Sequence, residues 1–294
     1  MREQLLPRLQ PFLDAHARDA SVRWYAITDS AQAPGLPAVI QEPGRELRCL
    51  FDAEQGTPLA EKAPHLVELA PPDAASPAWA WILTHAPRSP CATILATPMA
   101  FDPLFAMLQA ATEVLLPDGE AMFFAYWDPA ILGTLVGQPD DTSLHVPGPV
   151  LDKRQHEALS CGLAGWWYWD RYGQQHAVAT AYECADPAPL PLQLNQEQVD
   201  DLVEASMPDH LLYYVDLNQR HLLERIEGDP YRYVRAAYLQ ARALGLEGMQ
   251  DLVNFICVKI VYGARFDLDP AIGAVLKRVQ EGRISFTDAV AELP

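Results

Sequence analysis

The sequence is poor in positive charge and has no long apolar run. Its 294 residues include 21 Lys and Arg against 39 Asp and Glu, a formal net charge of −18. The excess is spread along the chain, with −10 in residues 1–150 and −8 in residues 151–294. Nucleic-acid-binding proteins need a basic stripe that displaces counterions, and none is visible. We therefore expect no nucleic-acid partner, no binding to anionic membrane surfaces and no membrane insertion.

Cysteine is also scarce, and its spacing is irregular. The odd number of cysteines and the lack of any Cys-x-x-Cys pair argue against a disulfide framework and a zinc ribbon. The five are Cys49, Cys91, Cys161, Cys184 and Cys257. Residues 1–14 mix Arg, Glu and Pro and contain no apolar segment typical of a secretion signal. We expect a cytoplasmic protein with reduced thiols.

The compact motifs of common enzymes are missing. The chain has no zinc-protease helix motif, no Gly-x-Ser-x-Gly turn and no phosphate-binding glycine-rich loop. His65 is predicted to be a structural histidine with satisfied hydrogen bonds, and Cys161 has no identifiable catalytic partner. The sequence therefore predicts no catalytic residue, no cofactor and no bound metal.

The first part of the chain has the pattern of an α/β (or α+β) domain with a mixed sheet and flanking helices. Asp118-Gly119 supplies the positive φ of a tight hairpin turn. Apolar residues at i, i+3, i+4 and i+7 predict a helix over 101–108, and Asp128 is placed to cap another. The remaining patterns predict strands over 22–29, 46–52 and from 66, a helix over 36–41 and a hairpin of 113–116 with 120–127, while 79–83 fits either strand or helix.

The last third of the chain is predicted to be an all-α helical bundle. Asn195 can cap a helix, with Gln198 at the reciprocal capping-box position. Further helices follow, and the broadest apolar stripe runs from Leu252 to Val261. We therefore expect an α/β domain over 1–185 with its core at about 20–170, a proline-rich linker over 186–194 and a helical domain over 195–294.

Aromatic residues gather at two places in the α/β part. Such residues either pack in a core or anchor a protein interface, and the acidic charge makes base stacking an unfavourable alternative. As candidate partner-binding residues we select Trp127, Trp166, Trp167 and Trp169.

An ordered set of short motifs spans about residues 20–170. It resembles the type VI secretion system effector adaptor or chaperone family, in which domain of unknown function 4123 precedes a variable helical tail. The residues that carry the resemblance are Tyr25, Asp29, Phe51, Asp52, Gly56, Pro58, Leu59, Pro64, Leu66, Asp118, Gly119, Tyr126, Asp128, Pro129, Gly148 and Pro149.

The resemblance implies a non-enzymatic bacterial adaptor in the cytoplasm. Its partners would be a cognate effector toxin and a VgrG-type spike protein, onto which the effector is loaded before secretion. We hypothesise that the α/β domain and the helical domain divide these two binding tasks. The family implies no catalytic residues.

Two other function classes stay open at this stage. A metal-dependent or acid/base hydrolase would use the strand-end carboxylates Asp29, Asp52 and Asp128, if they converge in one pocket. Capping of turns and helices is the more common role of Asp at such positions. A weaker alternative is an immunity-type protein that neutralises a basic toxin through charge.

Overall fold

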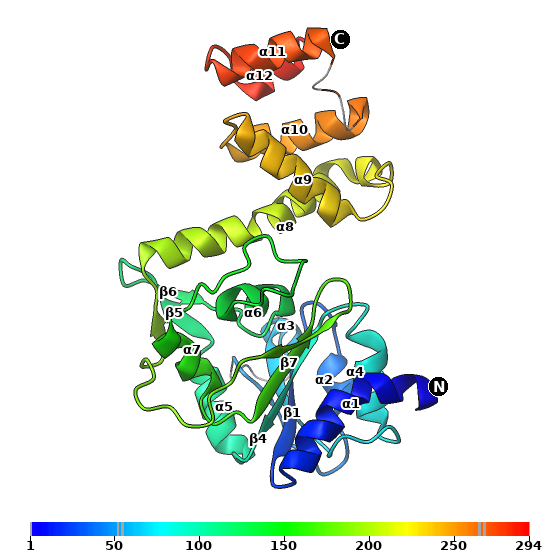
Figure 1. Ribbon diagram of the computed structural model, residues 1–294, viewed down its shortest axis with the longest axis vertical. Coiled ribbons are helices and arrows are strands. Elements are labelled where there is room, and N and C mark those ends of the chain that lie inside the picture. The colour runs from blue at the N-terminus through cyan, green and yellow to red at the C-terminus, as the bar shows by residue number, and fades with distance from the viewer. Residues whose placement is uncertain (1, 52, 54–55, 264–265, 267–268, 294) are drawn as a thin grey trace. The chain divides into compact units, whose positions relative to one another are not determined.

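The computed structural model describes residues 2–51, 53, 56–263, 266 and 269–293, with side chains from residue 5 onward. The chain divides into two compact units, Met1–Leu202 (unit 1) and Val203–Pro294 (unit 2). Unit 1 combines sheets with flanking helices, and unit 2 is helical (Figure 1). The predicted fold class, an α/β (or α+β) domain followed by an all-α region, is therefore confirmed.

Unit 1 is built on a six-stranded sheet with the order β2-β3-β1-β4-β7-β8. All neighbouring strands in it are antiparallel. The strands are β1 (Arg23–Asp29), β2 (Leu47–Cys49), β3 (Pro64–Leu69), β4 (Ala92–Thr97), β7 (Gly165–Trp169) and β8 (Gln175–Val178). The predicted strands over 22–29, 46–52 and from 66 correspond to β1, β2 and β3.

Both faces of this sheet are buried. Because side chains alternate between faces along a strand, Trp166 and Tyr168 of β7 join one apolar cluster, while Trp167 and Trp169 join the other. Strands that are covered on both sides are apolar at nearly every position. The aromatic run of β7 is thus explained by packing on two faces.

Helices cover the two faces separately (Figure 1). One cluster receives side chains from α1 (Arg2–Arg18), α2 (Leu36–Ile40) and α4 (Pro77–His85). The opposite cluster receives side chains from α5 (Phe101–Ala110), α6 (Pro129–Val136) and α7 (Lys153–Ser160). A short helix, α3 (Pro58–Lys62), begins after the Thr57 cap. The predicted helices over 36–41 and 101–108 and after Asp128 are confirmed as α2, α5 and α6.

The segment 79–83, which fits either strand or helix by its pattern, lies in α4. The Ser76 hydroxyl accepts a hydrogen bond from Trp79 N at 3.3 Å, and Pro77 occupies the first turn. Serine at the N-cap followed by proline is a helix-start signal. The Ser76-Pro77 signal therefore favours a helix over a strand, a choice that the apolar run 79–83 leaves open.

A second, three-stranded sheet has the order β6-β5-β9. Its strands are β5 (Glu113–Leu115), β6 (Ala121–Phe123) and β9 (Leu192–Gln193), and β9 runs parallel to β5. The predicted hairpin is confirmed, with Gly119 at φ +87° in its turn. The second strand ends at Phe123 instead of 127, because Asp128 N donates to Ala125 O and turns the chain.

The proline-rich segment 186–194 differs from the predicted linker. Its backbone is anchored in unit 1, since Ala188 N donates to Arg154 O at 2.9 Å, and β9 lies within it. Leu192 and Leu194 are buried. The two units instead divide after Leu202, inside a helix. Leu192 and Leu194, which follow the prolines, explain the difference, because their burial adds to the apolar core.

The helix that contains the boundary is α8 (Gln196–Leu223). Its start carries the predicted capping box: Gln198 N donates to Asn195 Oδ1 at 2.9 Å, and Asn195 N donates to Gln198 Oε1 at 3.0 Å. Unit 2 continues with α9 (Pro230–Ala243), α10 (Met249–Tyr262), α11 (Pro270–Gln280) and α12 (Phe286–Val290). Their apolar faces enclose one core that includes Tyr238, Phe255 and Phe286.

Candidate functional site

The strand-end carboxylates serve the local backbone. Asp29 is buried at the end of β1, and its Oδ1 accepts hydrogen bonds from Ala31 N at 2.9 Å and Gln32 N at 3.2 Å. Burial raises the pKa of Asp29, and these two bonds oppose the rise. Asp128 caps α6 by accepting from Ala130 N at 2.9 Å. Asp52 lies outside the described residues.

These carboxylates do not form a ligand set. Among the residues that the structure describes, neither Asp29 nor Asp128 belongs to a group of three or more side chains able to hold a metal ion. The hydrolase alternative built on strand-end acids therefore lacks support from Asp29 and Asp128. Capping of a turn and of a helix accounts for both residues.

The four candidate partner-binding tryptophans are buried. Trp166 and Trp169 are 0% and 1% exposed, and Trp127 and Trp167 are 6% and 7% exposed. In this structure they belong to the core of unit 1, so they do not form an exposed aromatic patch. The three tryptophans of β7 are buried because the sheet is covered on both faces, which pattern alone does not reveal. Trp127 lies in the turn before α6 and packs in the same cluster as Trp166. A binding surface must be sought elsewhere on the molecule.

The motif residues support turns and core packing. Tyr25 Oη donates to Met99 O at 2.9 Å, and Tyr126 Oη donates to Leu108 O at 2.9 Å. Gly148 has φ +69°, and a Cβ there would lie 2.0 Å from Thr134 O. Only glycine fits this position.

Most of the other motif residues start elements or line the core, but Gly56 is exposed and Leu59 is 52% exposed. Asp118 accepts from Glu120 N in the hairpin turn, and Leu66 is buried. Prolines begin α3, β3 and α6 at positions 58, 64 and 129. The resemblance thus rests mainly on scaffold residues.

His65 has the partners expected of a structural histidine. Its Nδ1 lies 2.9 Å from Ala63 O and 3.2 Å from Ser30 Oγ. Burial lowers the pKa of the imidazole, opposed by the bond to Ala63. All five cysteines are free thiols. Burial raises the pKa of Cys91 to about 11, so its reactive thiolate is suppressed.

One buried polar network in unit 1 was not predicted from the sequence. Tyr168 Oη donates to Asp141 Oδ2 at 2.9 Å, and His176 Nε2 lies 3.1 Å from Asp170 Oδ2. The Tyr168 and His176 rings stack with centroids 5.2 Å apart. Asp141, Asp170 and His176 each offer a ligand atom within 4.8 Å of the others. This is the one such group among the described residues.

The carboxylate oxygens of this network already have hydrogen-bond partners. Asp141 Oδ1 accepts from Ser143 N and Oγ at 2.9 and 2.6 Å. Asp170 Oδ1 accepts from Tyr172 N and Gln174 N at 2.8 and 2.9 Å. Burial, followed by the charge of Asp141, raises the pKa of Tyr168, which keeps the hydroxyl protonated as a donor. The network can therefore fix the loop at Asp141 and the turn between β7 and β8 without an ion.

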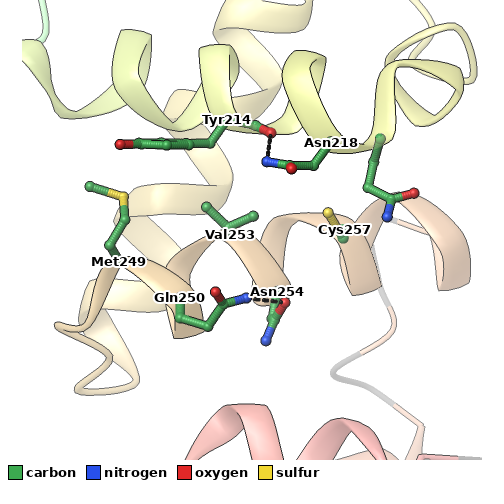
Figure 2. A pocket seen from close by; sticks show the side chains of 8 residues that line it. Tyr214, Asn218, Met249, Gln250, Val253, Asn254 and Cys257 are labelled. Carbon is green, nitrogen blue, oxygen red and sulfur yellow. Dashed lines mark hydrogen bonds between the residues drawn. The ribbon is translucent and has the colours of Figure 1, made fainter.

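A pocket of about 590 Å³ lies in unit 2 between α8 and α10 (Figure 2). We call it the α8–α10 pocket. Its lining has no charged side chain, although a fifth of the chain is charged. The lining residues are Tyr214, Asn218, Gln219, Met249, Gln250, Val253, Asn254 and Cys257.

The backbone of α8 bends beside this pocket. Gln219 departs from helical geometry, with φ −144° and ψ 42°. Asn218 Nδ2 donates to Tyr214 O at 2.8 Å, and Gln250 Nε2 donates to Asn254 Oδ1 at 3.1 Å (Figure 2). The amide groups that line the pocket can donate and accept. Such a lining suits the backbone of a peptide better than a charged ligand.

Exposed apolar side chains lie next to the pocket on α8. Tyr213 is 60% exposed, Tyr214 40% and Leu217 63%. Their spacing places Leu217 one turn beyond both tyrosines, so the three share one side of the helix. A contiguous exposed apolar patch beside a concave site is typical of protein interaction surfaces. The patch and the α8–α10 pocket form our candidate interaction site.

The two units differ strongly in charge. Unit 1 contains 26 Asp and Glu against 11 Lys and Arg, a net charge of −15. Unit 2 contains 13 against 10, a net charge of −3. A split of the sequence at residue 150 hides this asymmetry. The units therefore offer different electrostatic surfaces to partners.

Within the described residues, every helix is too short or too polar to cross a membrane. No curated protein and no solved structure matches the chain. A family model matches residues 24–145, from β1 through α6 to the loop that contains Asp141. The chain thus contains a segment that matches the family described as Domain of unknown function (DUF4123).

Proposed function

We propose that this chain is a non-enzymatic adaptor, or chaperone, of the bacterial type VI secretion system. It binds a toxic effector and loads it onto a VgrG-type spike protein in the cytoplasm before secretion. The observation that carries the proposal is the DUF4123 match over residues 24–145, together with the ordered motifs that resemble effector adaptors.

The roles of the motif residues in this chain favour binding over catalysis. Tyr25, Asp118, Tyr126 and Gly148 stabilise turns and core contacts. Asp29 and Asp128 are engaged by backbone amides. These residues build a rigid scaffold, which a protein that presents surfaces to two partners requires.

The division of the chain supports a division of labour. Unit 1 is strongly acidic, and unit 2 carries the uncharged α8–α10 pocket with its apolar rim. Surfaces of such different chemistry suit different partners. We propose that one partner binds each unit.

Co-purification of the full-length chain with candidate VgrG-type spike and effector proteins tests this proposal. The variant Leu217→Lys places a charge in the apolar patch, and Val39→Lys adds the same charge at a 56% exposed site of unit 1. We expect Leu217→Lys to weaken capture of one partner by about tenfold or more, while Val39→Lys retains both. Failure of the wild-type chain to capture either protein contradicts the proposal.

A metal-dependent hydrolase is the second candidate, favoured by the Asp141, Asp170 and His176 group. Elemental analysis of the purified chain and its Asp170→Asn variant separates the two functions. Stoichiometric metal in the wild type that is lost in the variant supports the hydrolase. The adaptor proposal predicts no metal dependence of partner capture.

A further inference from the structure

We propose that the outer edge of β6 binds an extended, basic segment of a protein partner as an additional strand of the small sheet. The proposal deepens the adaptor function, on which it rests, by naming a binding mode and the chemistry of the bound segment. It concerns unit 1 alone and uses the strand β6, Ala121–Phe123.

The position of β6 leaves one side of the strand open. The sheet order β6-β5-β9 places it at the end of the sheet (Figure 1). Among the residues that the structure describes, no strand pairs with its outer side. An edge strand presents a row of backbone donors and acceptors that can template another strand.

The register identifies which peptide groups face outward. Leu116 N donates to Glu120 O, and Phe124 N donates to Thr112 O, both at 2.8 Å. Val114 pairs with Met122 midway between these two bonded pairs. In an antiparallel ladder the bonded pairs alternate, so the peptide groups of Met122 face β5. Those of Ala121 and Phe123 point away from it.

The side chains of β6 are unusual for an exposed edge. Met122 is 43% exposed and Phe123 62% exposed, and the strand carries no charged residue. Proteins normally protect such edges with charges, prolines or bulges. The other sheet shows such protection, since its edge strand β2 contains Arg48. An apolar, unprotected edge indicates that a partner covers it.

Phe123 also extends an aromatic surface. Its ring stacks on Phe51 with centroids 4.9 Å apart, and Phe51 meets Trp127 edge-on at 5.4 Å. Phe51 is half-buried, whereas Trp127 is buried. The strand edge is therefore anchored to the core. An apolar side chain of an added strand would find a rigid contact beside Phe123.

The charge around the hairpin selects a basic segment. Residues 89–152 contain eight Asp and Glu and no Lys or Arg. Glu113 is exposed and lies opposite Phe123 in the register. Asp118 and Glu120 are exposed in the turn that leads into β6. Lysine or arginine side chains of a partner strand would meet these carboxylates, and an acidic strand would be repelled.

Amide hydrogen exchange of the full-length chain, measured by NMR, tests the register directly. The probe is a short synthetic peptide that alternates lysine and valine, and its counterpart alternates glutamate and valine. We expect the lysine peptide to slow exchange at Ala121 and Phe123 by about tenfold or more. Met122 should not change, because its amide is already bonded to Val114. The glutamate peptide should have no effect.

The variant Ala121→Pro removes one outward donor and spares the bonds to β5, since proline is tolerated at outward-facing edge positions. Retained protection of Met122 shows that the hairpin is folded. In this variant we expect the lysine peptide to protect Phe123 at least about fivefold less than in the wild type. Val39→Lys serves as the matched surface control and should behave as the wild type.

Three results would overturn the inference. The first is that the lysine peptide does not slow exchange at Ala121 and Phe123, and the second is that both peptides slow it equally. The third is that exchange at these residues slows as the protein concentration rises without any peptide, which would assign the edge to a second copy of the chain. Co-purification separates this inference from the adaptor proposal. If the wild type and Ala121→Pro both capture both partners, only the strand inference is overturned. If the wild type captures neither partner, the adaptor function is overturned.

Discussion

Tyr168 donates its hydroxyl to Asp141 Oδ2 at 2.9 Å across 27 positions of the sequence. Both residues are buried in unit 1. Asp141 lies within the segment that matches DUF4123, and Tyr168 lies beyond its end. The bond therefore ties the matched segment to β7. The compact unit that contains this segment extends past residue 145, because β7 and β8 complete its sheet.

Removal of this hydroxyl should destabilise unit 1. The variant Tyr168→Phe leaves a buried carboxylate oxygen without its donor, which costs about 1–3 kcal/mol of unfolding free energy. Urea unfolding followed by tryptophan fluorescence measures the loss. Tyr182→Phe removes a hydroxyl at a 55% exposed position and should change little. Equal unfolding free energies for both variants would show that the bond contributes nothing.

Replacement of Gly148 should lower the free energy of unfolding more than replacement of a glycine that also has a positive φ but has no atoms close to it. Gly148→Ala combines a positive φ with a clash against Thr134 O, whereas Gly35 has φ +77° and no atom within 4 Å of an added Cβ. We expect Gly35→Ala to cost about 1 kcal/mol and Gly148→Ala about 2 kcal/mol more. Similar melting temperatures for the two variants would contradict the crowded geometry at Gly148.

The stability of unit 1 should fall as the pH drops below about 6.5, the ordinary pKa of histidine. Burial lowers the pKa of His65 and of His156 in the folded state. The unfolded chain therefore takes up protons first, and the folded state loses stability as pH falls. His65→Asn keeps a donor for Ala63 O but does not titrate. Its melting temperature should drop less than that of the wild type between pH 7 and pH 5, and an equal drop would exclude His65 as a contributor.

Salt should distinguish partner binding at the two units. Exposed charges are screened over about 10 Å at 0.1 M ionic strength, so binding to the acidic unit 1 should weaken as sodium chloride is raised. Binding that is weakened by Leu217→Lys should depend little on salt, because the α8–α10 pocket is uncharged. Affinity measured by calorimetry at low and high salt tests this. Parallel salt dependence for both partners would contradict separate sites.

Local signals in the sequence predict much of the fold. Asp128 and Asn195 are recognisable caps because short polar side chains bond amides one turn away, and both make these bonds. Asp118-Gly119 predicts the hairpin for a similar reason. The N-terminal helix α1 is harder to predict because Pro7 and Pro11 lie inside it. Its signal is the spacing of Leu5, Leu9 and Phe12, which are buried.

Features that depend on distant contacts are not predictable in this way. Burial of Trp166 and Trp167 requires helices on both faces of the sheet, which the run of tryptophans does not specify. The network of Asp141, Asp170 and His176 joins a loop, the turn after β7 and the strand β8, so its members have no common motif. The α8–α10 pocket brings together residues about 30 or more positions apart, and one of them is Gln219, where the backbone of α8 bends. The charge asymmetry emerges only when the unit boundary is known.

If the chain is an adaptor, it joins two other proteins, and light scattering coupled to size-exclusion chromatography tests this most directly. The full-length chain is mixed with candidate effector and spike proteins, singly and together. The account predicts a complex with each protein alone and a larger complex that contains all three. Elution of the chain as a separate species from every mixture would contradict it.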